Sequence, residues 1–245
     1  MNSFSNKSNF VYPGKSLEAM SFAKNYHAWI YEKISKQLGH KIAEVGSGTG
    51  NFTEFLASNK NTSIDAYEPC VKMHSENKQN GNCQVNYINK TFNFDTVPLS
   101  KVYSSIVFIN VLEHIEDDLL VLKVAHKSLA RNGKLIIFVP ALQLLYSNFD
   151  KSVGHFRRYH REQLCGIVEK SKFTIDSCNY FDSFGILPWF LFMKILGGSL
   201  NSKSSLYYDR LIVPWLKILE SIILPPIGKN LLLIASKSVP DQECN

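Results

Sequence analysis

The sequence predicts an α/β fold, a doubly wound and mostly parallel sheet, and three observations carry this prediction. Short apolar runs typical of strands alternate with amphipathic helical segments between residues 41 and 182. The run 104–111 is apolar almost throughout, as expected for a strand buried on both faces of a sheet. A turn rich in glycine joins the first of these strands to the helix that follows it. We therefore expect strands and helices to alternate in space as they do along the chain.

The expected elements fall into four parts of one domain that covers residues 1–245. A helical segment (1–40) has apolar residues at helical spacing up to Ile34 and ends at Gly39. The core (41–182) follows, then an apolar helical insertion (183–228) and a final strand within 229–238. The expected strands are 41–45, 63–67, 85–88, 104–111, 134–139, 173–180 and 231–236. The expected core helices are 52–57, 71–79, 117–130 and 160–170.

Composition and charge narrow the class of protein. Hydrophobic residues make up 45% and charged residues 20% of the 245, which suits a globular chain with a sizeable core. The net charge of +6 is too dilute to indicate nucleic acid as a partner. The five cysteines form no CxxC pair and the polar N-terminus has no signal-peptide pattern, so we expect reduced thiols and a cytoplasmic location. No His/Asp/Glu cluster has the spacing of metal ligands, so no metal is expected.

The glycine turn at residues 46–50 indicates a ligand, and its spacing narrows the choice. Backbone N–H groups in such a turn, before a helix N-terminus, can approach a ligand closely. A dinucleotide fingerprint needs a third glycine where Asn51 stands, so an NAD-dependent enzyme is the weaker alternative. Glu44, just before the turn, would repel a pyrophosphate but suits the ammonium group of an amino acid.

Glu68 supplies the second part of this argument. It follows the second strand, where a carboxylate can accept the hydroxyls of a ribose. A ligand with both a nucleoside and an amino acid points to S-adenosylmethionine (SAM). The alternative is that Glu44 and Glu68 are solvated residues at two strand ends.

These motifs, with the run Asn110-Val111-Leu112-Glu113-His114-Ile115, resemble class I SAM-dependent methyltransferases over residues 20–182. The resemblance implies a seven-stranded Rossmann-like sheet and a glycine loop that wraps the methionine part of SAM. It implies that the acid after the second strand holds the ribose, that the residues after the third strand flank the adenine, and that 110–112 line the methionine moiety. The implied cofactor contacts are Tyr26, Trp29, Glu44, Gly46, Ser47, Gly48, Gly50, Asn51, Phe52, Glu68, Pro69, Thr91, Phe92, Asn110, Val111 and Leu112. For Tyr26 and Trp29, plain core packing of their helix is an equal alternative.

Two histidines are the candidates for catalysis, His114 after the fourth strand and His155 after the fifth. A structural brace is the alternative for His114. Arg157, Arg158 and Tyr159 are expected to bind an acceptor with an acidic group, because guanidinium offers a planar fork of donors. The alternative is a basic surface loop that pairs with Asp150 and Glu162.

The Asp150-to-Tyr159 segment also resembles bacterial methyltransferases linked with polysaccharide and lipid biosynthesis. That likeness implies O- or N-methylation of a small-molecule, sugar or lipid-linked acceptor. A module that binds SAM without catalysis remains the alternative.

The first apolar run of the insertion, 184–196, is too short to span a bilayer, which takes about 20 apolar residues. In the second helix of the insertion Lys217, Glu220 and Ser221 share one face, while Trp215, Leu219, Ile222 and Ile223 share another. Residues 184–227 are therefore interpreted as a lid over the acceptor, a homodimer interface or a peripheral membrane contact. Plain packing of the helices on the sheet is the remaining interpretation.

Overall fold

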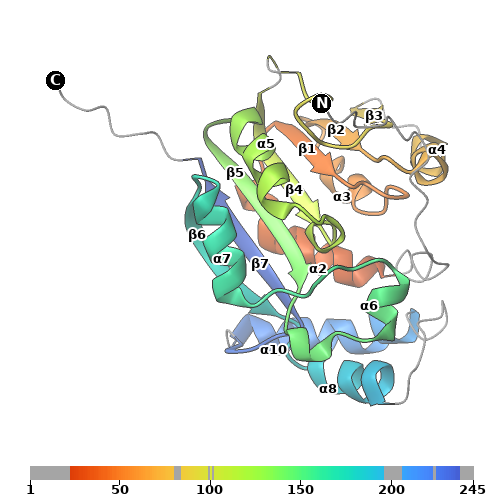
Figure 1. The fold of residues 1–245 in the computed structure, drawn as a ribbon. Coiled ribbons are helices and arrows are strands. Elements are labelled where there is room, and N and C mark those ends of the chain that lie inside the picture. The colour runs from red at the N-terminus through yellow and green to blue at the C-terminus, as the bar shows by residue number, and fades with distance from the viewer. Residues whose placement is uncertain are drawn as a thin grey trace.

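The computed structural model of the chain describes residues 23–79, 84–98, 100, 102–195, 206–222 and 225–237. Within them a seven-stranded sheet carries helices on both of its faces (Figure 1). The strands are β1 (Lys41–Val45), β2 (Ser63–Tyr67), β3 (Val85–Ile88), β4 (Tyr103–Ile109), β5 (Leu129–Pro140), β6 (Thr174–Phe181) and β7 (Asn230–Ser236). The predicted fold class is confirmed.

The order of the strands places a ligand edge in the middle of the sheet. The order is β3-β2-β1-β4-β5-β7-β6, and only β7 runs antiparallel to its neighbours. The chain moves outward from β1 to β3 and then returns to place β4 on the other side of β1. Ligands of open α/β sheets bind beyond the carboxyl ends of the strands at such a switch point.

Two hydrophobic cores follow from the alternation of side chains along the strands. On β5, Leu135 and Ile137 belong to one core with α5 (Asp118–Ser128) and α7 (Arg161–Lys170). Ile136 and Phe138 belong to the other, with α2 (Lys24–Ile34), α3 (Thr53–Leu56) and α10 (Val213–Ile222). The shorter elements are η1 (Ser35–Gln37), α4 (Val71–Gln79), η2 (Leu112–His114), η3 (Gln143–Leu145) and α6 (Asn148–Ser152).

Most predicted boundaries lie within two residues of the observed ones, and the boundary between α5 and β5 differs most. The helix expected to reach residue 130 ends at Ser128, and β5 begins at Leu129 rather than at Lys134. Leu129 pairs with Tyr103, and the register shifts before Ser105 pairs with Lys134. Asn132 takes the left-handed conformation (φ 57°) within this irregular stretch. The long-range pairing therefore overrides a sequence that is typical of a helix end.

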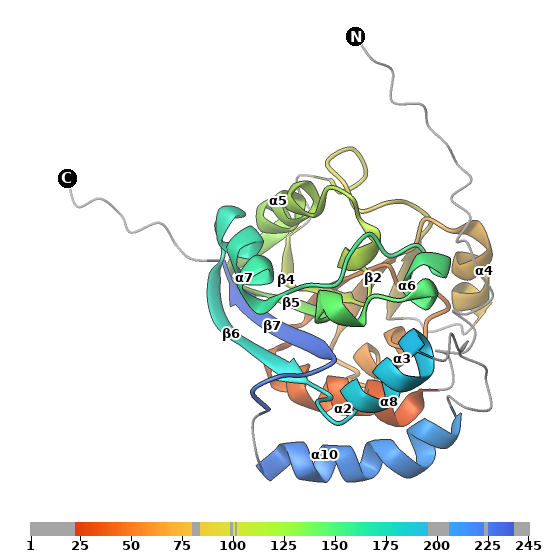
Figure 2. The ribbon, with the colours of Figure 1, turned by 60° about the horizontal axis from the view of Figure 1, so that its bottom comes forward.

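The insertion forms α8 (Ile186–Trp189), η4 (Phe190–Ile195), η5 (Tyr208–Ile212) and α10. Figure 2 shows α10 on the outer side of α2. Ile223, which was expected on the apolar face of α10, lies outside the described residues. None of the helices in the described part of the chain is long and apolar enough to cross a membrane.

The amphipathic prediction for α10 needs a correction, because an acid from its expected polar face points inward. Glu220 is buried, while Trp215 is 70% and Ile222 is 76% exposed. The Glu220 carboxylate accepts hydrogen bonds from the backbone N–H groups of Asp182 (3.0 Å) and Ser183 (2.7 Å). These long-range bonds compensate for the burial of the acid and turn the apolar side of the helix outward.

Candidate functional site

The glycine turn lies at the carboxyl end of β1, as predicted. Gly46, Gly48 and Gly50 all have positive φ (72°, 54° and 91°), a conformation that favours glycine. A Cβ atom at Gly46 would lie 2.6 Å from a methyl carbon of Val111, whereas one at Gly48 would meet nothing within 4 Å. Gly46 therefore packs against the segment after β4, and Gly48 faces open space where a ligand can approach.

Glu68 ties this turn to the end of β2. One carboxylate oxygen accepts from the Gly48 N–H (2.9 Å), and the other accepts from the Cys70 N–H (2.8 Å). The side chain is buried, and burial raises the pKa of Glu68 although both backbone hydrogen bonds oppose the shift. Each oxygen keeps a further lone pair, so the arrangement is compatible with the ribose role, which stays a prediction.

Glu44 is also buried rather than solvated, and it is the penultimate residue of β1. Its carboxylate accepts a hydrogen bond from the Thr53 hydroxyl (2.6 Å) at the start of α3. Burial raises the pKa of Glu44 to about 8, the nearby Glu68 charge adds to the shift, and the Thr53 bond opposes it. The burial of Glu44 and Glu68 argues against the interpretation as solvated strand ends. Sequence reasoning missed Thr53, because nothing in the sequence distinguishes it from any other threonine at the start of a helix.

The remaining predicted cofactor residues form two groups. Ser47 accepts a hydrogen bond from the amide of Asn77 on α4 (3.0 Å), another residue that sequence reasoning missed. Around the turn, Asn51 bonds Thr49 (2.9 Å) and Phe52 packs edge-on against His27. After β2 and β3, Pro69 is half-buried, Thr91 is exposed and Phe92 packs into the core against Tyr67. Contact of these residues with a cofactor stays a prediction.

The segment after β4 turns sharply beside the glycine turn. Asn110 has φ 52°, and its N–H donates to the Phe138 carbonyl oxygen (2.8 Å). Val111 covers Gly46, Leu112 is fully buried, and the chain continues into η2. The predicted methionine-lining residues thus lie next to the turn, although Val111 and Leu112 serve the packing.

Tyr26 and Trp29 have contacts that match the core-packing alternative. The Tyr26 hydroxyl lies within hydrogen-bond distance of two acceptors, Asp182 (3.2 Å) and Asn230 (3.0 Å), at the β6–β7 end of the sheet. The Trp29 ring lies 4.0 Å from the ring of Phe181. Both side chains are buried. A cofactor contact by either residue stays a prediction.

Asp150 is the centre of the basic segment. It accepts from His155 Nδ1 (2.9 Å), from Arg158 Nε (2.8 Å) and Nη2 (3.2 Å), and from the Ser147 N–H (2.9 Å). Burial alone would raise the pKa of Asp150, but the His155 bond and the Arg158 charge outweigh it and hold the pKa at about 2. Arg158 is itself buried, and its guanidinium lies over the Trp189 ring (4.8 Å). The predicted alternative, a pair with Asp150, is observed, in the interior and not in a surface loop.

The other two predicted acceptor residues bond to Asp118 at the start of α5. Arg157 Nη1 lies 2.7 Å from the Asp118 carboxylate, and the Tyr159 hydroxyl donates to the same carboxylate (2.9 Å). Tyr159 is fully buried, and its backbone N–H donates to the Pro140 carbonyl oxygen. The donors of Arg157, Arg158 and Tyr159 are thus directed at acids of the chain. Their contact with an acceptor stays a prediction.

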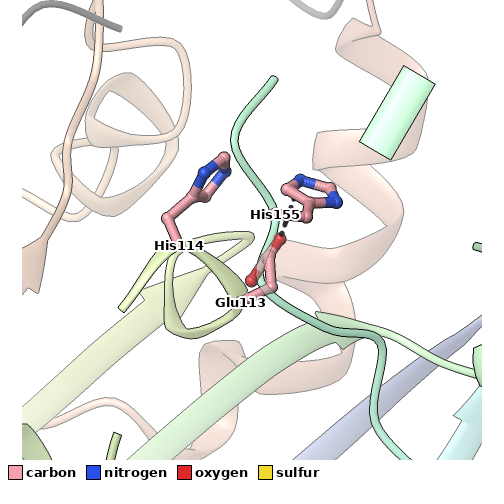
Figure 3. A group of neighbouring side chains, drawn as sticks. All are labelled: Glu113, His114 and His155. Carbon is pink, nitrogen blue, oxygen red and sulfur yellow. Dashed lines mark ion pairs between the residues drawn. The ribbon is translucent and has the colours of Figure 1, made fainter. Parts of the chain in front are cut away.

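The two predicted catalytic histidines are neighbours. The rings of His114 and His155 meet edge-on, 4.5 Å apart, and His155 Nε2 lies 3.8 Å from a carboxylate oxygen of Glu113 (Figure 3). Burial lowers the pKa of His114 to about 3, the charge of His155 lowers it further, and a bond with the Gly154 backbone opposes the shift. That bond fits the brace interpretation of His114 and leaves the base interpretation open.

Glu113 corrects the expectation that no metal-ligand cluster exists. Ligand atoms of Glu113, His114 and His155 all lie within 4.8 Å of one another. Glu113 and His114 belong to η2, whereas His155 follows α6. Sequence spacing could not reveal the group, because its third member arrives from a distant part of the chain.

Comparison with known proteins identifies the family. The family model of the methyltransferase domain matches residues 22–177. A SAM-dependent methyltransferase of Archaeoglobus fulgidus superposes with a TM-score of 0.61 and 18% identity, over 90% of this chain and 98% of that one. The N-methyltransferase NodS of Bradyrhizobium japonicum, in complex with S-adenosylhomocysteine, gives 0.56 and 14% identity over 88% and 87%.

A third structure, from Haloferax volcanii, is a complex of the Trm112 methyltransferase activator with a protein described as a methyltransferase. It gives a TM-score of 0.65 and 10% identity over 94% of both chains. No curated protein sequence matches the chain. At these identities the structures show the fold alone, while the family model covers most of the chain. The chain belongs to the methyltransferase-domain family and is a class I methyltransferase that uses SAM as its cofactor.

Proposed function

We propose that the enzyme methylates an oxygen or nitrogen atom of a sugar or lipid-linked acceptor, and that it works at the inner face of a membrane. The observation that carries the proposal is the outward-facing apolar side of the insertion. The cofactor supplies an electrophilic methyl group, so the main task of the protein is to align the acceptor atom with it. A hydroxyl must lose its proton and an amine must arrive neutral.

Two imidazoles suit this task. His114 and His155 adjoin the segment 110–112 that we assign to the methionine part of SAM. We assign them to the acceptor side, where their ring nitrogens would face the nucleophilic atom. Arg157 and Arg158 would then act indirectly, because their bonds to Asp118 and Asp150 hold in place the segment that carries His155.

The insertion presents two opposite stripes along η5 and α10. The inner stripe, Asp209, Val213, Leu216 and Glu220, is buried. The apolar stripe, Leu211, Trp215, Ile218 and Ile222, is exposed by 55% to 76% per residue. The members of both stripes follow each other at spacings of four, three and four, so each stripe occupies one face of the helical segment. Exposed apolar groups in such an array mark an interaction surface.

The neighbouring helical segment adds to the exposed apolar surface. Figures 1 and 2 show α8 and α10 at the same end of the molecule. The exposed large hydrophobic residues on and beside α8 and η4 are Phe184, Leu187, Leu191, Phe192 and Ile195. An interfacial helix pair of this kind lies in the plane of a membrane and does not cross it.

The charges of the insertion favour lipid over a second protein copy. Its only acids in 184–227, Asp209 and Glu220, are both buried. Asp209 accepts from the backbone N–H groups of Asn25 and Tyr26 (2.9 Å each) at the start of α2. Arg210 is exposed, and Lys217 is partly exposed beside Glu32. Lys217 is paired with Glu32, so Arg210 is an exposed basic group that matches the anionic headgroups of a membrane.

Flotation with lipid vesicles tests the membrane contact. We expect the protein to float with vesicles of phosphatidylcholine and phosphatidylglycerol, and less with phosphatidylcholine alone. The double substitution Trp215→Ser and Ile222→Ser should reduce the bound fraction at least about 10-fold, because it removes two exposed apolar anchors. The matched control is Leu120→Ser, an exposed leucine of α5. No flotation, together with a dimer in sedimentation that the double substitution breaks, would assign the surface to a second copy.

Transfer of a labelled methyl group tests the acceptor class. The protein is incubated with methyl-labelled SAM and either the organic or the aqueous extract of membranes from its source organism. The proposal expects label in the organic extract or in a glycan released from it. Label confined to water-soluble metabolites would contradict the lipid-linked assignment without affecting the family.

A further inference from the structure

We infer that Glu113, His114 and His155 form a binding site for a divalent transition-metal cation, at the end of β4 beside the predicted position of the methyl group. The potential ligand atoms of the three side chains lie within 4.8 Å of one another. Figure 3 shows the side chains, two from η2 and one from the segment after α6, gathered in one region.

The first observation is the state of the Glu113 carboxylate. Glu113 is 0% exposed, and neither of its carboxylate oxygens has a hydrogen-bond partner among the described residues. Its nearest cationic candidate, His155 Nε2, is 3.8 Å away, beyond hydrogen-bond length. A buried carboxylate without hydrogen-bond partners is costly, so its persistence calls for an explanation. A cation in the cluster would satisfy it.

The second observation is the orientation of His155. Its Nδ1 atom lies 2.9 Å from the Asp150 carboxylate, which two bonds from Arg158 hold in place. A carboxylate partner fixes the proton on Nδ1 and directs the lone pair of Nε2 the other way, toward Glu113. Metal-ligating histidines have such partners almost without exception.

The third observation is that His114 is held in an equivalent manner. The backbone of Gly154 bonds its ring, which fixes the orientation of the imidazole beside His155. The two segments are tied together, because the Phe156 N–H donates to the Glu113 carbonyl oxygen (2.9 Å). Donors bonded to a metal at about 2.1 Å lie about 3 to 4 Å from one another, so small side-chain movements would close the cluster.

The fourth observation is the chemistry of the donors. Two imidazoles and one carboxylate suit Mn²⁺, Fe²⁺, Co²⁺ or Zn²⁺ better than Ca²⁺ or Mg²⁺, which prefer oxygen. Three protein ligands leave coordination positions open, as in catalytic metal sites.

The role of the cation rests on the proposed function, whereas its binding does not. Because η2 begins at Leu112, within the segment 110–112, a bound cation would hold an acceptor oxygen near the methyl group and lower the pKa of that hydroxyl. Among sugar or lipid-linked acceptors, one with a metal-binding oxygen would be favoured. This role extends to the amine case only as an orienting contact.

Cobalt binding tests the site without SAM, acceptor or membrane. Protein stripped with EDTA and dialysed is titrated with Co²⁺, and visible absorption reports imidazole coordination. We expect one Co²⁺ per chain and an affinity at least about 10-fold lower in Glu113→Gln and in His155→Gln. The matched control is His160→Gln, an exposed histidine near His155 in the chain, which should bind as the wild type does. S-adenosylhomocysteine binding to each variant shows whether it has folded.

A second measurement needs no variant. Mn²⁺ added to the wild-type protein should broaden the imidazole NMR signals of His114 and His155 and leave those of His126 and His160 sharp. No Co²⁺ binding by the wild type, Co²⁺ binding that Glu113→Gln and His155→Gln leave unchanged, or broadening of all histidines alike would overturn the site. Methyl transfer that proceeds at the full rate in EDTA would overturn the catalytic role alone.

Discussion

Glu68 and Glu113 are both buried acids that follow strands of the same sheet, yet their surroundings differ sharply. Glu68 has each carboxylate oxygen bonded to a backbone N–H group, whereas neither oxygen of Glu113 has such a partner among the described residues. The carboxylate of Glu68, at the end of β2, is therefore fully bonded within the chain. The proposed acceptor side, between η2 and α6, is braced by the bonds of Asp150 with His155 and Arg158, and we propose that Glu113 there binds a cation.

The largest effect on stability is expected at the buried pair of Asp150 and Arg158. Arg158→Met should destabilise the protein by about 3–5 kcal/mol, because Asp150 would remain buried without its guanidinium partner. Urea unfolding measures the change. Arg161→Met, the same substitution on an exposed arginine of α7, should cost no more than about 0.5 kcal/mol. Equal stability of the two variants would show that the buried pair does not brace this side.

Gly48→Arg should have the next largest effect, and it should weaken binding of the cofactor rather than the stability of the protein. The new side chain would occupy the open space above the turn, and its positive φ adds strain. We expect affinity for S-adenosylhomocysteine to fall at least about 100-fold, roughly 2.7 kcal/mol, in a protein that stays folded by circular dichroism. Gly166→Arg, at another glycine with open space, is the control and should bind normally. Retained affinity in Gly48→Arg would mean that another loop holds the cofactor.

Glu68→Ala tests whether Glu68, whose two oxygens already accept backbone hydrogen bonds, also binds the ribose of the cofactor. Its loss should weaken S-adenosylhomocysteine binding about 10-fold in calorimetry, as removal of charged hydrogen bonds does. Glu76→Ala changes a largely exposed acid of α4 that pairs only loosely with Lys72 (3.9 Å), and it should have no effect. Similar losses in both variants would discredit the ribose assignment.

The raised pKa of Glu44 predicts that the stability of the protein depends on pH. Its folded pKa of about 8 lies above the ordinary value of 4.5, so between these values the unfolded chain is ionised while the folded one keeps its proton. The contribution of Glu44 to stability is complete below about pH 4.5 and declines as pH rises to 8, by at most about 1.4 kcal/mol per unit. Urea unfolding of the cofactor-free protein at pH 6 and 7 should show a flatter slope in Glu44→Gln. Glu54→Gln, at an exposed site, should keep the wild-type slope. An unchanged slope in Glu44→Gln would place its pKa elsewhere.

The sequence predicted those features whose cause is local. The strands follow from short apolar runs, and β1, β2 and β3 begin and end at the predicted residues. The glycine turn with Glu44 and Glu68 could be predicted because strand ends in a parallel sheet share one edge. The beginning of β5 could not, since it depends on the pairing of Leu129 with Tyr103.

The proposed acceptor side and the insertion were less predictable, because their side chains bond to residues that are distant in the sequence. Arg157 and Arg158 suggested an acidic acceptor, but they bond to Asp118 and Asp150. Glu220 belongs to the polar face of a helical wheel, yet it turns inward to the N–H groups of Asp182 and Ser183. A pattern in one helix cannot reveal such long-range hydrogen bonds.

The most direct test of the account is a calorimetric titration of the wild-type protein and Glu113→Gln with S-adenosylhomocysteine, with NAD as the comparison ligand. We predict micromolar binding of S-adenosylhomocysteine by both proteins, within about 2-fold of each other, and no binding of NAD. That result would separate the cofactor edge from the acceptor side. Binding of NAD, or loss of S-adenosylhomocysteine binding in a folded Glu113→Gln protein, would contradict the account.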